Sequence, residues 1–147
     1  MTMVKTGKRA GIYYLIIDNK QTIHGLQREF NKHFPFLKLE FFRERIKKGT
    51  RDPKNLIITT NELISRLQQM SHSGKIAFNK DTTVNELEKC FLSEYGLYAQ
   101  VFRKSGNIWL VTTSTDDWTL EQQNEEGNSL AQHLNTEKEN LDDHDVY

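Results

Sequence analysis

The feature that most constrains the fold of this chain is a pattern that occurs twice. In Thr22–Phe30 and in Thr83–Phe91, a threonine is followed at the same spacing by a leucine and a phenylalanine. Around them, apolar residues recur at spacings of three, four and four: Ile23, Leu26, Phe30 and Phe34, then Val84, Leu87, Phe91 and Tyr95. This spacing marks one face of an α-helix. Two matching amphipathic helices predict an internal duplication.

Similar elements flank the two helices. Pro35 and Gly96 end them, and each helix is then followed by residues that alternate between apolar and polar, which is typical of a strand with one buried face. The expected helices cover residues 22–33, 61–71, 83–95 and 119–134. The expected strands cover 12–18, 36–43, 55–60, 75–79, 97–103 and 107–113, with a tight hairpin at 104–107. Thr59-x-x-Glu62, Thr83-x-x-Glu86 and Thr119-x-x-Gln122 are candidate capping boxes.

The order of elements predicts an α+β protein built from a βαββα unit that occurs twice. Residues 1–11 would form a flexible basic N-terminus, 12–74 the first copy, 75–134 the second, and 135–147 a disordered acidic tail. The order of elements in 12–79 also matches a ferredoxin-like, split βαβ unit. Each copy is near the lower size limit for an independent core, so we expect the two copies to pack as a pseudo-dimer.

Composition excludes several classes of protein. The chain has 147 residues and a mean hydropathy of -0.70, yet eight Phe, five Tyr and two Trp can form a core. A single cysteine, Cys90, excludes an intramolecular disulfide framework. The longest apolar run, residues 12–17, is too short for a membrane span or a signal peptide. We therefore expect a cytoplasmic protein without a membrane segment, and no motif predicts a cofactor.

Charge is divided unevenly along a chain whose net charge is zero. Residues 1–115 carry 19 basic and ten acidic residues, a net charge of +9. Residues 116–147 carry one basic and ten acidic residues, a net charge of -9. Such asymmetry is typical of a chain with a polyanionic partner or an interaction tail, although charge blocks also occur only to keep a protein soluble.

Basic and aromatic residues gather at the two expected hairpins. The first turn contributes Arg43, Arg45, Lys47, Lys48, Arg51 and Lys54, and the second contributes Arg103 and Lys104. Nearby strand positions on the face away from the core carry Phe42, Phe102 and Trp109. Phosphates bind such cations, and exposed rings stack on unpaired bases. This combination favours a non-enzymatic module that binds single-stranded nucleic acid, with the acidic stretch Glu137–Asp145 acting as an intramolecular brake.

An alternative function stays open from the same residues. The strand aromatics could instead be buried where two chains, or this chain and another protein, meet. The protein would then be an interaction or assembly module, with a homodimer as one form of it.

A few other residues could serve in catalysis or bind a metal ion. Asp116 and Asp117 could hold a divalent cation such as Mg²⁺ or serve as an acid and base, but they also suit the start of the helix after Thr119. Cys90 has no evident activating partner in the sequence, and we expect it to be a structural thiol. The five histidines lack the spacing of a metal site, and no phosphate-binding glycine loop occurs. We therefore expect that the protein is not an enzyme.

Three blocks of sequence also carry a resemblance. Thr82–Lys89, Gln100–Leu110 and Thr115–Asn124 resemble a family of small, functionally unassigned bacterial proteins, and the run Asp-Asp-Trp-Thr-Leu is specific. Phe30–Phe42 is similar to the N-terminal half of that family. The resemblance covers most of the chain and implies no activity.

Overall fold

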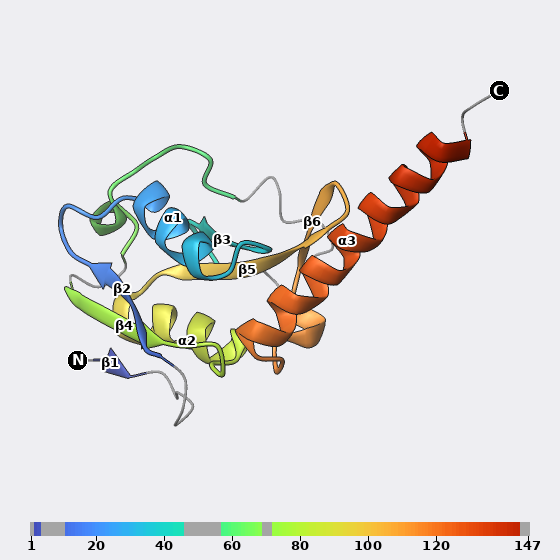
Figure 1. The fold of residues 1–147 in the computed structure, drawn as a ribbon. Coiled ribbons are helices and arrows are strands. Elements are labelled where there is room, and N and C mark those ends of the chain that lie inside the picture. Colours follow the sequence, from blue (N-terminus) through green and yellow to red (C-terminus); the bar gives the residue numbers. More distant parts are fainter. Residues whose placement is uncertain (1, 4–10, 46–56, 69–71, 145–147) are drawn as a thin grey trace.

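The computed structural model describes residues 2–3, 11–45, 57–68 and 72–144, with side chains for 11–45, 57–68 and 72–133. The chain is an α+β protein (Figure 1). Its strands are β1 (Thr2–Met3), β2 (Tyr13–Ile17), β3 (Leu37–Phe42), β4 (Gly74–Phe78), β5 (Tyr98–Ser105) and β6 (Ile108–Val111). Its helices are α1 (Ile23–His33), α2 (Val84–Tyr95) and α3 (Leu120–His144), with short 3-10 helices η2 (Ile64–Arg66) and η3 (Thr113–Thr115).

The strands form two sheets, and each sheet contains strands from both the earlier and the later part of the chain. We call the described residues from Gly11 to Gln68 the first half and those from His72 to His144 the second half. One sheet has the order β1-β4-β2 and the other the order β3-β5-β6. In both, a strand of the first half pairs antiparallel with a strand of the second: β2 with β4, and β3 with β5. The strands expected at corresponding places in the two copies therefore pair with each other.

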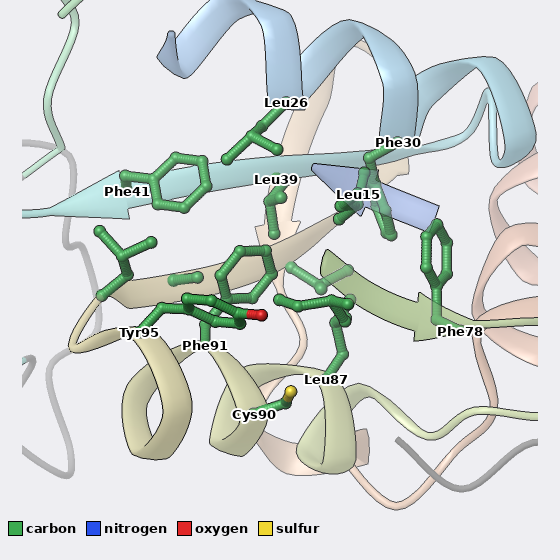
Figure 2. Packing of buried hydrophobic residues seen from close by; sticks show 14 of the residues in the cluster. Leu15, Leu26, Phe30, Leu39, Phe41, Phe78, Leu87, Cys90, Phe91 and Tyr95 are labelled. Atoms are coloured by element: carbon green, nitrogen blue, oxygen red, sulfur yellow. The ribbon is translucent and has the colours of Figure 1, made fainter. Parts of the chain in front are cut away.

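The main core lies between the two sheets and is closed by α1 on one side and α2 on the other (Figure 2). Leu26 and Phe30 reach in from α1, while Leu87 and Phe91 reach in from α2. Both helices bury the apolar stripe that the sequence predicted, because burial of those side chains removes apolar surface from water.

Local signals position the ends of these helices. The Thr22 hydroxyl accepts a hydrogen bond from the Gly25 N–H at 3.0 Å, and Thr83 accepts one from the Glu86 N–H at 3.1 Å. Gly96 ends α2 in the left-handed region at φ 62°, where a side chain would be strained. These helices therefore begin and end within a residue or so of the predicted bounds.

Two elements of the first half differ from the prediction. Where a helix was expected over 61–71, the described residues form only η2, and 69–71 lie outside them. Where a strand was expected over 55–60, Ile57 makes an isolated bridge with Phe42, Ile58 donates its N–H to the Phe41 carbonyl at 2.9 Å, and 55–56 lie outside the described residues. The capping box at Thr59 does not form: η2 begins after Leu63, and the Glu62 carboxylate pairs with the Arg43 guanidinium.

The ferredoxin-like expectation for residues 12–79 is wrong. A ferredoxin-like unit places its strands in one sheet, whereas β2 and β3 lie in different sheets. The order of elements along a chain does not determine which strands pair, and here pairing runs between the halves. The duplication itself stays a prediction.

The two ends of the chain also differ from expectation. Thr2 and Met3, placed in a flexible segment by the sequence, pair in parallel with Ile76 and Ala77. At the other end, α3 continues to His144 instead of ending near Leu134, and its last turns extend away from the rest of the molecule (Figure 1). No proline or glycine occurs between Asn128 and His144, and this composition favours a continuous helix. None of the described helices combines the length and hydropathy needed to cross a membrane.

Candidate functional site

The face of the β3-β5-β6 sheet that points away from the core collects polar and aromatic side chains, and we call it the outer face. Because side chains alternate along a strand, residues that face each other across strands share a face. The ladder places Lys38 opposite Phe102, Glu40 opposite Gln100, and Phe42 opposite Tyr98. The next strand adds Trp109 opposite Lys104. The predicted hairpin aromatics thus do lie together on one face of one sheet.

A cavity of about 540 Å³ opens on this face, and we call it the Trp109 cavity. The start of α1, the segment after Ile57 and the β5–β6 turn surround it. Its lining consists of His24, Gln27, Lys38, Glu40, Ile57, Ile58, Thr59, Phe102, Asn107, Ile108 and Trp109. The volume is in the range of pockets that hold small molecules or single nucleotides.

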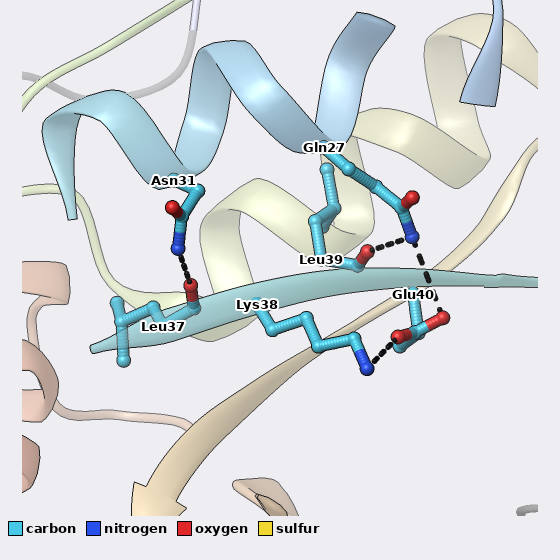
Figure 3. A network of polar contacts seen from close by, with 6 residues as sticks. All are labelled: Gln27, Asn31, Leu37, Lys38, Leu39 and Glu40. Carbon is cyan, nitrogen blue, oxygen red and sulfur yellow. Dashed lines mark hydrogen bonds and ion pairs between the residues drawn. The ribbon is translucent and has the colours of Figure 1, made fainter. Parts of the chain in front are cut away.

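A chain of polar contacts organises the wall of the Trp109 cavity (Figure 3). The Lys38 ammonium lies 2.7 Å from a Glu40 carboxylate oxygen, and the Gln27 amide donates to the Leu39 carbonyl at 2.8 Å and to the other Glu40 oxygen at 3.4 Å. Asn31 in turn donates to the Leu37 carbonyl at 3.0 Å. Glu40 is only 5% exposed, so this pairing offsets the cost of burying its charge.

Trp109 is flanked by two cations. The ammonium groups of Lys38 and Lys104 lie 5.5 Å and 5.0 Å from the centroid of its ring, within the range of a cation–π interaction. The ring is partly exposed and lines the cavity. An aromatic surface and two positive charges therefore meet at the mouth of one cavity.

A smaller cavity of about 240 Å³ lies at the other end of the outer face, and we call it the Glu88 cavity. Glu88 accepts a hydrogen bond from the Val101 N–H at 2.8 Å. Burial of its carboxyl group raises the pKa of Glu88 to about 8; the Val101 hydrogen bond lowers it and the Asp116 charge adds to the rise. Gln100 lines the same cavity, and its buried Oε1 has no hydrogen-bond partner among the described residues.

The basic residues predicted to bind phosphate do not form one patch. Arg43 is exposed and pairs with Glu62, while Arg45 is exposed and lines the Glu88 cavity. Arg103 turns toward α3, where it donates to Gln123 at 2.8 Å and lies 5.6 Å from the Trp118 ring centroid. Lys47, Lys48, Arg51 and Lys54 lie outside the described residues. Among the described residues that were predicted to bind phosphate, Lys104 is the cation that lies beside the Trp109 ring.

The predicted stacking role of Phe42 and Phe102 needs correction. Their side chains are on the expected face, but Phe42 is 2% exposed and Phe102 is 5% exposed. A base cannot stack on a ring that offers no open surface, so both residues serve instead as apolar lining of the two cavities. The alternation along the strands predicted correctly on which face of the sheet these two side chains lie. It could not predict how much of each ring is buried by other side chains.

None of the catalytic candidates lines either cavity, although the Asp116 charge acts on Glu88. Cys90 is buried, and burial raises the pKa of its thiol to about 11, so little thiolate exists near neutral pH. Asp117 is exposed, and the Asp116 carbonyl accepts the Asn85 N–H at 2.8 Å. Within the described ranges, no three His, Cys, Asp or Glu side chains gather in a way that could hold a metal ion.

Sequence reasoning missed Lys38, Gln27 and His24. Lys38 could have been found, because it alternates with Leu37 and Leu39 and therefore faces the same side as Phe42. Gln27 and His24 had no such signal, since their place at the cavity depends on how α1 lies along the edge of β3.

Comparisons of the chain with protein-family models, with curated proteins and with solved structures found no match. The resemblance to a family of unassigned bacterial proteins stays a prediction.

Proposed function

We propose that the protein is a non-enzymatic module that binds single-stranded nucleic acid on the outer face of the β3-β5-β6 sheet. The observation that carries this proposal is that the Lys38 and Lys104 ammonium groups both lie within 5.5 Å of the centroid of the Trp109 ring, which lines a cavity of about 540 Å³. Stacking of a base on a tryptophan contributes on the order of 1–3 kcal/mol without requiring a particular sequence. The two ammonium groups are close enough to pair with the phosphates of the stacked nucleotide.

Binding uses the mobility of lysine side chains. A base that approaches Trp109 replaces an ammonium group on the ring, and the displaced lysine stays within reach of the adjacent phosphate because its stem is flexible. The exposed Arg45 and Arg43 would bind further phosphates of the nucleic acid beyond the cavity. Lys47, Lys48, Arg51 and Lys54 belong to the same proposal from the sequence alone.

Fluorescence anisotropy with labelled single-stranded RNA and DNA tests this function. Trp109→Ala should weaken binding by about tenfold or more, whereas Leu110→Ala should not change it, because alternation places Leu110 on the opposite face of β6. Lys38→Gln and Lys104→Gln should each reduce the salt dependence by about one phosphate contact, and Lys20→Gln should leave it unchanged. Absence of salt-sensitive binding by the full chain would refute the proposal.

The acidic stretch Glu137–Asp145 would act as a brake by competing for the same cations. This requires the last turns of α3 to leave the extended position that they have in Figure 1. A chain that ends at Leu134 should bind nucleic acid more tightly than the full chain at low salt. Equal affinity of the two chains would refute the autoinhibition by the acidic stretch but not the proposed binding site.

An exposed apolar stripe favours protein interaction as the second candidate function. Ile12, Tyr14 and Ile16 are 46%, 38% and 45% exposed, and they follow each other on one face along β2, an edge strand. A second copy of the chain that covered this stripe would remove apolar surface from water. In sedimentation experiments, a dimer that Ile16→Lys dissociates and Leu110→Lys does not would support this function.

A further inference from the structure

The two cavities occupy corresponding places in the two halves of the molecule. Gln27 and Glu88 are each the fifth residue after the threonine that caps their helix, Thr22 or Thr83. Glu40 and Gln100 face each other across β3 and β5, and Lys38 and Tyr98 each lie two residues before them. The Trp109 cavity is lined by Gln27, Lys38, Glu40 and Phe102, and the Glu88 cavity by Glu88, Tyr98, Gln100 and Phe42.

This correspondence makes the polar groups of the two cavities directly comparable. In the Trp109 cavity, the buried acceptor is Glu40, and it is satisfied from within the chain by the Lys38 ammonium at 2.7 Å and the Gln27 amide at 3.4 Å. One acceptor thus meets one cation and one neutral donor, which is a balanced arrangement for a buried carboxylate.

In the Glu88 cavity, no cation of the described residues pairs with the corresponding acceptors. The amide of Gln27 is replaced by the carboxyl group of Glu88, and the ammonium of Lys38 by the ring of Tyr98. Gln100 Oε1 is buried without a hydrogen-bond partner, and no lysine or arginine among the described residues lies within 4.0 Å of the Glu88 carboxyl oxygens. Buried acceptors are rarely left without donors in folded proteins, so this cavity lacks a group that its counterpart contains.

We propose that the Glu88 cavity binds an alkylammonium or guanidinium group, which donates hydrogen bonds to the Glu88 carboxylate and to Gln100 Oε1. The Tyr98 and Phe42 rings would contact the alkyl part of the ligand, and a guanidinium could bond both acceptors through its fork of N–H groups. The volume of about 240 Å³ admits one such head group with a short stem. This site is separate from the Trp109 cavity and does not depend on nucleic-acid binding.

The other charged groups around this cavity define the far end of the ligand. Arg45 and Lys89 line it with exposed side chains, and Asp116 contributes to the electrostatics at Glu88. Cations at the mouth disfavour a ligand with a second positive charge and favour one with a carboxylate. The ligand is therefore either a small molecule with one cation and one carboxylate, such as an N-acylated basic amino acid, or an arginine or lysine side chain presented by a peptide.

Calorimetry with the full-length protein tests the site and distinguishes the two sources. N-acetylarginine has the guanidinium and a carboxylate, N-acetylargininamide mimics an arginine within a peptide, and N-acetylcitrulline is a neutral isostere. Both arginine derivatives should bind, and citrulline should not. Tighter binding of the acid than of the amide indicates a small zwitterionic ligand, and equal binding indicates a peptide side chain.

Variants and pH make the test specific to the acceptors. Because Glu88 must be ionised, binding should be about 100-fold weaker at pH 6 than at pH 9, as the ionised fraction falls. Tyr98→Lys should abolish binding by supplying the missing ammonium from within the chain, as Lys38 does in the other cavity. Glu88→Gln should also abolish it. Binding that survives in both variants, or no binding of either arginine derivative at pH 9, would overturn the proposal.

Discussion

The two halves of this molecule begin in the same way and end differently. In each half, the residue just before a later helix forms a bridge with the threonine that caps the first helix. Leu63, before η2, pairs with Thr22, and Thr119, before α3, pairs with Thr83. The flanking backbone bonds also match, since the Ile23 N–H donates to Glu62 and the Val84 N–H to Trp118. Beyond the bridge, the first half forms the three-residue η2, whereas the second forms the 25-residue α3.

The two halves differ in the residues that could cap this second helix. Thr119 and Gln122 exchange hydrogen bonds at 2.8 Å and 3.1 Å and start α3 as a capping box. Thr59 and Glu62 have the same spacing, but the Glu62 carboxylate binds Arg43 and Thr60 instead. The Arg43 contact lowers the pKa of Glu62, as an ion pair at this place would. At the position that the two bridges match with Thr119, the first half has Leu63, which makes no side-chain cap hydrogen bond, and only η2 follows it.

The largest expected change in the free energy of unfolding comes from core residues of the two corresponding helices, α1 and α2. Phe30 and Phe91 are both fully buried in the main core. Phe30→Ala and Phe91→Ala should each reduce the free energy of unfolding by about 3–5 kcal/mol, because each leaves a cavity in the same core. Urea denaturation measures both values. A loss below about 1 kcal/mol for either variant would mean that the halves do not contribute equally to one core.

The next largest effect is the pH dependence of the free energy of unfolding, which Glu88 contributes and the corresponding Gln27 does not. Since the native state raises the pKa of Glu88 from 4.5 to about 8, it binds this proton more tightly than the unfolded chain does. The stabilisation is complete below pH 4.5 and is lost as the pH rises through 8. The free energy of unfolding should fall by roughly 4 kcal/mol from pH 5 to pH 9. In Glu88→Gln, urea titrations should show a much flatter pH dependence; an unchanged slope would contradict this assignment.

A smaller effect tests how α3 is attached to the sheet. A methyl group at Gly127 would lie 2.8 Å from Phe36 Cβ and 3.3 Å from the Lys104 carbonyl oxygen. Gly127→Ala should therefore destabilise the protein by about 1–3 kcal/mol, even though alanine is the better helix former. Thermal unfolding provides the comparison, with Ser129→Ala on the exposed side of α3 as control. A more stable Gly127→Ala would indicate that α3 can move off β3 without cost.

The smallest effect concerns two of the three candidate capping boxes. Thr119→Ala should reduce the free energy of unfolding by about 1 kcal/mol, because Gln122 loses its partner. Thr59→Ala should change it by less than about 0.5 kcal/mol, since no helix begins there. Chemical denaturation of both variants decides between a formed cap and an unused one. Equal losses would contradict the difference between the halves.

Local patterns predicted more of this fold than long-range ones. The bounds of α1 and α2 followed from Thr22, Thr83 and the apolar spacing, because a cap and a helical face depend on nearby residues. The β5–β6 hairpin also formed as expected, with Gly106 in the left-handed region at φ 62°. Pairing of β2 with β4 joins residues far apart in the chain, and the sequence order contains no direct information on it.

The candidate site was predictable to a similar degree. The sequence placed Trp109 on the outward face of its strand and Lys104 in the adjoining turn, and the structure extends β5 through Lys104 so that the two residues lie opposite each other. The direction of Arg103 could not be predicted, because it depends on Gln123 and Trp118 from a distant part of the chain. Burial of Phe42 and Phe102 was missed for the same reason.

The exchange of strands between the halves has a consequence for synthesis of the chain. When β2 and β3 leave the ribosome, their partners β4 and β5 have not yet been made. Until residue 105 emerges, β3 has an unpaired edge beside apolar side chains, and such edges are prone to associate with other chains. Folding of this protein must therefore wait until most of it has been translated, and the nascent first half is the stage at which a chaperone would protect it.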